Sequence, residues 1–162
     1  MISEKMKNRI KDIYKNNPDN YHSTGSLKGE LRIFRCGENS IEELMGKTVI
    51  EIDGAESESE HIFIKCSDDS VYIMYHEQDC CESIQVEDIC GDLNALLNSP
   101  ITMAESVTEC SDKDDENSYT YTFYKLATVK GYVTIRWYGE SNRYYSEDVN
   151  FLYVGKEGYE HD

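Results

Sequence analysis

The stretch from residue 119 to residue 138, YTYTFYKLATVKGYVTIRWY, contains the strongest strand signals of the chain and sets its fold class. Tyrosine, threonine and phenylalanine dominate its first half, and these residue types favour the pleated surface of a β-sheet. Lys130-Gly131 predicts a turn. Beyond the turn, apolar residues alternate with polar and aromatic ones, which places the two sets on opposite faces of a strand. The apolar set is Val133, Ile135 and Trp137, and the other set is Tyr132, Thr134, Arg136 and Tyr138. The stretch therefore predicts a β-hairpin with two chemically different faces.

Shorter strand signals lie on both sides of this hairpin. Alternating or β-branched runs predict strands at 48–53, 61–66, 71–76, 84–87, 101–104 and 149–153. Ser40 and Asp92 each precede a short apolar run and predict the caps of two short helices, whereas 56–60 and 105–118 are acidic and predict loops. Hairpin connections dominate and no long βαβ crossover is visible. We therefore expect an α+β, mainly β fold: an antiparallel sheet or half-barrel with two or three short helices.

The N-terminal segment differs from the rest of the chain in charge. Residues 2–15 predict an amphipathic helix, with apolar residues at helical spacing and lysines on the other face. Residues 1–35 contain eight basic and four acidic side chains, whereas residues 36–162 contain eight basic and 28 acidic ones. We divide the chain into a basic helix and linker at 1–35, an acidic β-rich domain at 36–155 and a polar tail at 156–162. The helix either packs on the sheet, which we favour, or docks as an arm on an acidic surface.

The net charge of −16 limits the partners of the chain. A surface this negative repels nucleic acid and anionic membranes, so we expect neither as a direct partner. It suits a basic protein, and it also suits a surface that is merely solvated. The sequence contains no apolar run of about 18 to 20 residues and begins without the apolar segment of a secretory signal. We therefore expect a cytoplasmic protein whose six cysteines are reduced thiols.

Polar residues gather in the segment 76–90, which follows a predicted strand. Four of them could bind zinc through nitrogen and sulfur. These are His76, Cys80, Cys81 and Cys90. Their spacing matches no standard zinc motif. A cysteine next to His76 could also act as a nucleophile, and the segment could equally be a polar turn with small buried thiols. No phosphate-binding or hydrolase motif is present, so we assign no catalytic residue and no cofactor, and retain zinc only as an alternative.

Two further groups of residues are candidates for binding. Carboxylates in two stretches could meet a basic partner: Glu56, Glu58 and Glu60, and Asp112, Asp114, Asp115 and Glu116. Aromatic, arginine and asparagine side chains around a Gly-Ser-Asn loop form the other group: Arg136, Trp137, Tyr138, Asn142, Arg143, Tyr144 and Tyr145. Such a group suits a protein interface or a pocket for a planar or anionic ligand. It also suits a hairpin end whose tyrosines simply cover the sheet.

Several longer words of the sequence resemble an uncharacterised domain family found in tailed-phage genomes. The words are YHEQDCCE at 75–82, EDICGD at 87–92, SPI at 99–101, TFYK at 122–125, GYVTIRWYG at 131–139, SN at 141–142 and YYSE at 144–147. They span about half of the chain, and the basic N-terminal helix lies outside them. The resemblance implies a phage source and no known activity, so it carries over no catalytic role.

A phage source gives the acidic charge a further interpretation. Small acidic phage proteins often act on host proteins that bind nucleic acid through basic channels, where carboxylates can take the place of phosphates. We predict an acidic inhibitor of a host nucleic-acid-binding or defence protein, of the anti-CRISPR kind, acting in the host cytoplasm. The alternative is a protein that sequesters a nucleotide, another small ligand or a metal between segments 76–90 and 136–147. The partner and the oligomeric state stay open.

Overall fold

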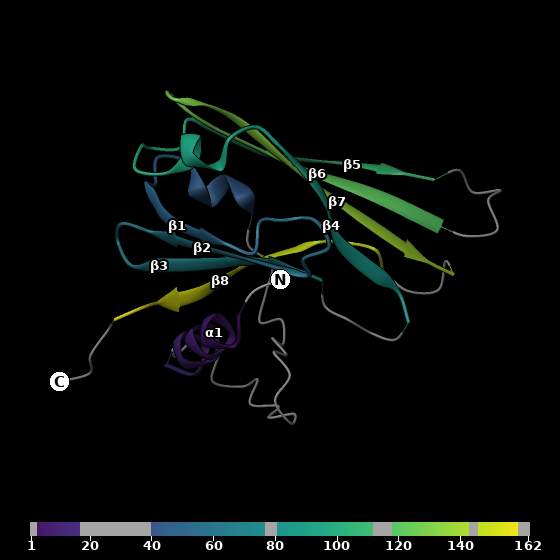
Figure 1. The fold of residues 1–162 in the computed structure, drawn as a ribbon, viewed down its shortest axis with the longest axis horizontal. Helices are drawn as coiled ribbons and strands as arrows, with labels where there is room; N and C mark the ends of the chain where they lie inside the picture. Colours follow the sequence, from purple (N-terminus) through teal and green to yellow (C-terminus); the bar gives the residue numbers. More distant parts are fainter. Residues whose placement is uncertain (1–2, 17–39, 77–80, 112–117, 143–145, 159–162) are drawn as a thin grey trace.

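The computed structural model describes residues 3–16, 40–76, 81–111, 118–142 and 146–158. Its strands form two four-stranded antiparallel sheets that face each other as a sandwich (Figure 1). The first sheet has the strand order β1-β2-β3-β8 and the second has the order β4-β7-β6-β5. The strands of the first sheet are β1 (Val49–Asp53), β2 (His61–Cys66), β3 (Ser70–Tyr75) and β8 (Asn150–Lys156). Those of the second are β4 (Ser83–Cys90), β5 (Met103–Cys110), β6 (Ser118–Thr128) and β7 (Gly131–Ser141).

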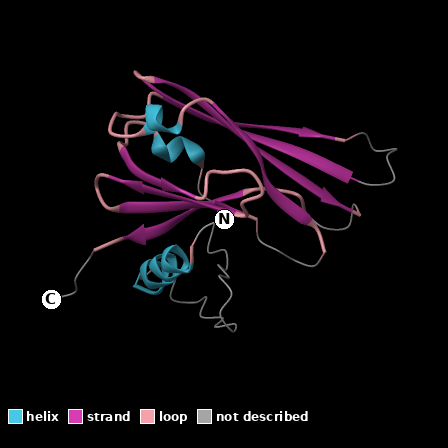
Figure 2. Cartoon of the chain, in the orientation of Figure 1, coloured by secondary structure: helices cyan, strands magenta, loops and turns pink. Residues whose placement is uncertain are grey.

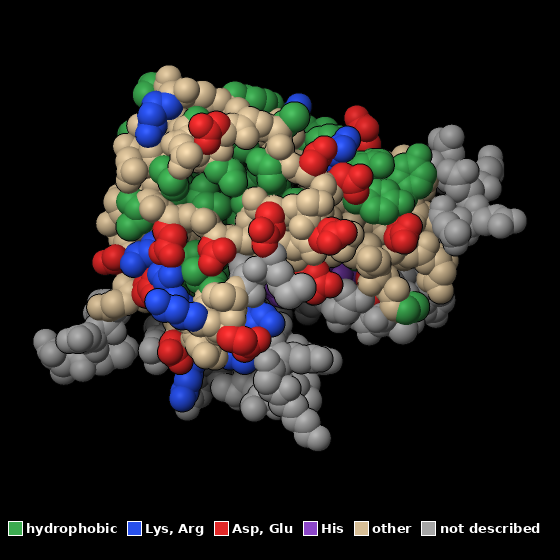
Figure 3. All heavy atoms as spheres, in the orientation of Figure 1, with side chains coloured by type: hydrophobic (Ala, Val, Ile, Leu, Met, Phe, Trp, Pro, Cys, Tyr) green, Lys and Arg blue, Asp and Glu red, His purple; other side chains and the backbone are tan. Residues whose placement is uncertain are grey.

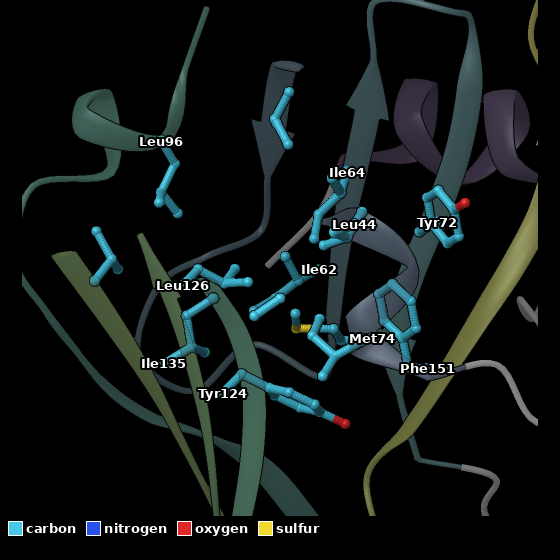
Figure 4. Close-up of a cluster of buried hydrophobic side chains, with 14 of the residues drawn as sticks. Leu44, Ile62, Ile64, Tyr72, Met74, Leu96, Tyr124, Leu126, Ile135 and Phe151 are labelled. Carbon is cyan, nitrogen blue, oxygen red and sulfur yellow. The ribbon is translucent and has the colours of Figure 1, made fainter. Parts of the chain in front are cut away.

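The main hydrophobic core lies between the two sheets, where inward side chains from both layers meet (Figure 4). Along β6 and β7 buried residues alternate with more exposed ones, as the sequence of the hairpin predicts. In the first sheet, the rings of Tyr72 and Phe151 stack with centroids 5.1 Å apart. Two short 3-10 helices, η2 (Ile41–Leu44) and η3 (Leu93–Leu96), contribute Leu44 and Leu96 to this core. Ser40 and Asp92 are their N-caps, which confirms the two predicted caps.

The outer face of the first sheet is covered by α1 (Glu4–Asn16), which lies across it in Figure 1. The apolar stripe of the helix packs on this face in a second hydrophobic cluster. The helix contributes Met6, Ile10 and Ile13, and the sheet contributes Phe63, Val71, Ile73, Tyr75, Leu152 and Val154. This arrangement confirms the prediction that the N-terminal helix packs on the sheet. The first sheet is therefore buried on both of its faces.

An ion-pair cluster joins α1 to the same sheet. Arg9 forms a bidentate pair with Glu51 of β1, with Nη–Oε distances of 2.7 and 2.9 Å. A second bidentate pair joins Arg9 to Glu157, at 2.8 and 2.7 Å. The guanidinium carbon also lies 4.8 Å from the ring centroid of Phe63. Arg9 thus combines a cation–π contact with two carboxylates, the geometry that a planar guanidinium favours.

The described residues place no such cover on the outer face of the second sheet. In the described part of the chain, no helix packs on it (Figure 2), because η2 and η3 lie on its core side. Its outward residues on β6 and β7 are half-buried or exposed rather than buried. Within the described residues the sandwich is therefore asymmetric: one outer face lies under a helix, and the other does not.

The structure corrects parts of the predicted fold. The strands form a sandwich of two open sheets rather than a half-barrel, with one α-helix and two 3-10 helices in the described residues. β4 extends to Cys90, beyond the predicted end at 87. β5 continues to Cys110 through the first half of the predicted loop at 105–118, and it pairs with β6 along its whole length. β5 is an edge strand in which only Ala104 is buried, so it lacks the alternation that identifies a strand.

No helix in the described ranges is long and apolar enough to cross a membrane.

Candidate protein-binding surface

Four aromatic side chains gather on the open outer face of the second sheet, and we call them the aromatic face. They are Tyr119, Tyr121 and Phe123 of β6, and Tyr138 of β7. Residues two apart on a strand point to the same side, and the register places Tyr121 directly opposite Tyr138. The rings of Tyr121 and Tyr138 lie 5.1 Å apart, and those of Tyr121 and Phe123 lie 6.3 Å apart. These contacts hold the rings as one platform of large, rigid side chains.

Carboxylates stand on both flanks of the aromatic face. Glu105 and Glu109 come from the edge strand β5, and Glu87 and Asp88 come from the opposite edge strand β4. All four are exposed. The register places Glu109 opposite Tyr121. Figure 3 shows hydrophobic side chains with acidic ones around them over the second sheet. The face therefore combines aromatic contact area with negative charge at its rim.

Tyr138 and Glu140 connect the platform to its charged rim. The Tyr138 hydroxyl donates a hydrogen bond to Oε2 of Glu140 over 3.1 Å. Burial, and next to it this hydrogen bond, raise the pKa of Tyr138 to about 12. The phenol therefore stays neutral at physiological pH and acts as a donor toward the carboxylate. Glu140 itself is exposed.

Arg136 lies on the same face and shows what the face can hold. Its guanidinium carbon is 5.6 Å from the ring centroid of Tyr121. Its Nη2 lies 2.7 Å from Oδ2 of Asp88, the residue opposite it on β4. One arginine of the chain is thus placed between an aromatic ring and a carboxylate. Arg136 and Tyr138, both predicted as binding residues, do share one surface.

The acidic turn at 56–60 runs along the free edge of β4. The Glu58 amide donates to the Val86 carbonyl, and the Val86 amide donates to the Ser59 carbonyl, both at 2.8 Å. Glu56, Glu58 and Glu60 are exposed there. The predicted acidic stretch thus lies next to the strand that carries Glu87 and Asp88. The other predicted stretch, with Asp112, Asp114, Asp115 and Glu116, lies outside the described residues.

Trp137 is not available on this surface, which corrects its prediction as a binding residue. Its side chain is fully buried in the core between the sheets. The physical reason is the strand alternation itself, since Trp137 and its neighbours Arg136 and Tyr138 must point to opposite sides. Asn142 is exposed just beyond β7. The remaining predicted residues of this group, Arg143, Tyr144 and Tyr145, lie outside the described ranges.

The two polar segments, 76–90 and 136–147, do meet, because β4 pairs with β7. Next to this pairing, His76 contacts Glu82 and the chain just beyond the second segment. Nδ1 of His76 lies 2.6 Å from the carbonyl oxygen of Asp148, and its Nε2 lies 3.2 Å from Oε2 of Glu82. The His76 and Glu82 side chains are 4% and 0% exposed. Both ring nitrogens of His76 therefore have internal partners. This arrangement suits a structural joint between His76, Glu82 and the backbone at Asp148 more than a ligand site.

Glu147 forms a second buried joint at this end. Its Oε1 accepts hydrogen bonds from the hydroxyls of Ser118 and Thr120, at 3.1 and 2.7 Å. Its Oε2 accepts one from Ser141 at 2.5 Å. Gly139 permits the close approach, because a Cβ there would lie 3.1 Å from the Glu147 carbonyl oxygen and 2.8 Å from a side-chain carbon of Ile84. Three hydroxyl donors offset the cost of burying the carboxylate.

The four residues predicted as zinc ligands do not form one site. His76 lies close to the first residues of β4, whereas Cys90 ends that eight-residue strand. At about 3.3 Å per residue, the two ends are roughly 23 Å apart. Zinc ligands must lie within about 2.3 Å of the metal. Cys81 is exposed, and Cys80 lies outside the described residues. Among the described residues, no group of three or more His, Cys, Asp or Glu side chains could hold a metal ion.

Sequence analysis did not identify five of the residues that belong to this surface, namely Tyr119, Tyr121, Phe123, Glu105 and Glu109. For the three aromatic residues a signal was present. The alternation of the hairpin, continued back from Tyr138 through the turn, places them on the same side as Arg136. The two glutamates had no such signal, because their strand looked like a loop.

The comparisons with known proteins give a family but no activity. A family model described as a domain of unknown function, DUF7448, matches residues 42–151. This range includes the second sheet and β1 to β3 of the first sheet, but it excludes α1 and most of β8. No curated protein and no solved structure matches the chain.

Proposed function

We propose the following function for this chain, which belongs to the DUF7448 family of unknown function: it is an acidic binding protein that docks through its aromatic face on a basic surface of another protein. The observation that carries the proposal is the open outer face of the second sheet. It combines four aromatic rings with carboxylates on both flanks, while the opposite outer face is already covered by α1. Tyrosine is one of the residues that most often contribute binding energy in protein interfaces. Because the face carries negative charge, a complementary partner surface should be positively charged.

The partner that fits best is a protein that binds nucleic acid. Its basic surface is built to receive a dense row of phosphates, and the chain offers a net charge of −16 on a rigid scaffold. Glu56, Glu58 and Glu60 continue the negative charge beyond the edge of β4. The chain would act by occupying this surface in place of nucleic acid. The resemblance to phage sequences supports a host target, such as a defence protein inhibited in the manner of an anti-CRISPR.

The test is a competition experiment with the full chain. Tagged protein is used to capture partners from a bacterial lysate, which are then eluted either by a salt gradient or by duplex DNA at constant low salt. We expect the captured partners to be nucleic-acid-binding proteins and the added DNA to release them, because DNA and the chain compete for the same basic surface. Partners that stay bound in high salt and in the presence of DNA would contradict the proposal.

A pair of matched variants assigns the binding to the aromatic face. The double substitution Tyr121→Thr and Tyr138→Thr removes two central rings but keeps residues that favour strands. We expect it to fold and to lose the captured proteins. The control is Tyr132→Thr, which changes an outward tyrosine of β7 that is 49% exposed and lies about 20 Å from Tyr138 along the strand. Capture that survives the double substitution would place the interface elsewhere.

A further inference from the structure

We infer that the aromatic face selects arginine side chains of its partner over lysine side chains, and that Tyr121, Phe123 and Glu109 receive one of them. The inference rests on the proposed function and adds the chemistry of the group that is bound. It follows from the way in which the chain holds its own arginines, from the register of β5 and β6, and from the charges on the face.

The chain places arginine over an aromatic ring on both of its outer faces. Arg9 lies over Phe63 and pairs with Glu51 and Glu157. Arg136 lies over Tyr121 and pairs with Asp88. In both cases the plane of the guanidinium can face a ring while its N–H groups reach carboxylates, a combination that suits the planar, weakly hydrated guanidinium better than the compact, strongly hydrated ammonium of lysine. Lys47 also combines the two contacts, with its Nζ 5.9 Å from the ring centroid of Tyr72 and 2.7 Å from Oδ2 of Asp68, so the experiment compares the two cations directly.

The β5 side of Tyr121 offers a second place of the same kind. Arg136 and Asp88 occupy the side toward β4, whereas Glu109 stands opposite Tyr121 on β5. Directly opposed side chains on neighbouring strands have Cβ atoms about 5 Å apart, close enough for one guanidinium to contact both. Glu109 is exposed, and within the described part of the chain no ion pair involves it.

Apolar area for the stem of an arginine is next to this place. Val107 is 41% exposed and lies opposite Phe123 in the register of β5 and β6. The methylene groups of an arginine pack well on such a surface while the charged end reaches outward. Two adjacent strands therefore provide all three features that an arginine needs. The ring faces come from Tyr121 and Phe123, the apolar surface for the stem comes from Val107, and the carboxylate comes from Glu109.

The experiment compares two peptides of equal length and charge. Each carries six cations separated by glycine and serine, as arginine in one peptide and lysine in the other. Binding to the full chain is measured by fluorescence anisotropy over a range of salt. We expect the arginine peptide to bind more tightly, by at most roughly two- to fivefold for each side chain that stacks, which is the full contribution of an exposed cation–π contact. Glu109→Gln and Tyr121→Thr should each reduce this preference, whereas Tyr132→Thr should leave it unchanged.

The outcomes separate the inference from the proposed function. Equal binding of both peptides, lost with salt, would overturn arginine selection and leave the docking of a basic partner intact. A preference for arginine that Glu109→Gln and Tyr121→Thr do not change would overturn the assigned place. Binding of neither peptide at low salt would overturn both. Thermal unfolding of each variant shows whether it is folded, and Phe123→Leu provides a second variant of the same place that keeps an apolar side chain.

Discussion

The outer faces of the two sheets share one strand geometry but differ in what covers them. On the first sheet, Phe63, Val71 and Ile73 are completely buried beneath α1. On the second sheet, the outward residues Tyr121 and Phe123 are only half-buried, and no described helix lies over them. Aliphatic side chains gain about 25 cal/mol for each Å² that leaves water, so the first face needs its helix. Tyrosines with charged neighbours can stay partly exposed to water in the absence of a partner, because each ring carries a polar hydroxyl group.

The helix on the covered face also shows what a partner of the open face should provide. It brings an apolar stripe and an arginine that reaches two carboxylates of the protein. The open face has aromatic contact area and carboxylates, and its Arg136 pairs with Asp88 on the β4 side, which leaves the β5 side with Glu109 for the cation of a partner. The comparison therefore predicts that substitutions on the covered face act on stability, whereas those on the open face act on binding.

The largest effect on the free energy of unfolding should follow from a substitution at Ile10, on the covered face. This residue is fully buried between α1 and the sheet, so Ile10→Asp places a carboxylate where it cannot be solvated. We expect a loss of about 4 kcal/mol in the free energy of unfolding, measured by urea titration. Asn8→Asp introduces the same side chain at an exposed position of the helix and should change stability little. Equal losses in the two variants would show that α1 does not depend on its apolar stripe.

His61 should give the covered face a dependence on pH. Burial, with a smaller contribution from Lys7 of α1, lowers the pKa of His61 from 6.5 to about 4. Between these values the unfolded chain binds a proton that the folded chain does not, so stability falls as the pH decreases from 6.5 toward 4. The loss should reach about 2 to 3 kcal/mol. His61→Gln should flatten the unfolding free energy over this range, and an unchanged slope would contradict the assignment.

Arg9 should show an intermediate effect that also depends on pH. Its hydrogen bonds lower the pKa of Glu51 and of Glu157, so these carboxylates stabilise the fold above their ordinary pKa near 4.5 and lose this contribution as the pH falls. We expect Arg9→Met to cost about 2 kcal/mol at pH 7, less than for a fully buried pair because Arg9 is 24% exposed. The cost should shrink at pH 3. Lys5→Met, at an exposed position of the same helix, is the control.

The fold was more predictable than the surface, and the strands show why. In the hairpin of β6 and β7, alternation of buried and exposed residues reports the core directly, so its position and its inward set were predicted. The pairing of β3 with β8 joins Ser70 to Lys156 across the whole domain, and no local pattern indicates which distant strands pair. For this reason a sandwich of two sheets could not be distinguished from a half-barrel.

The candidate surface was only partly predictable for a related reason. Arg136 and Tyr138 were identified from their residue types, but the same reasoning included Trp137, which the alternation places in the core. Glu109 could not be identified, because β5 is polar on both sides and its strand character comes from pairing with β6. Likewise, the contact between His76 and the carbonyl oxygen of Asp148 joins residues 72 positions apart, so it depends on the tertiary structure.

The smallest effect on stability should come from a matched pair of glutamates, and it tests the comparison most directly. Glu51 pairs with Arg9 on the covered face, so Glu51→Gln should cost about 1 kcal/mol by weakening charge-assisted hydrogen bonds. Glu109 is exposed on the open face, so Glu109→Gln should change the free energy of unfolding by less than about 0.5 kcal/mol. The same Glu109→Gln should weaken binding of the arginine peptide. Glu51→Gln should not, because the Glu51 carboxylate already pairs with Arg9 of α1. A stability loss at Glu109 comparable to that at Glu51 would mean that the open face is also part of the structural framework, and the division between a face that stabilises and a face that binds would fail.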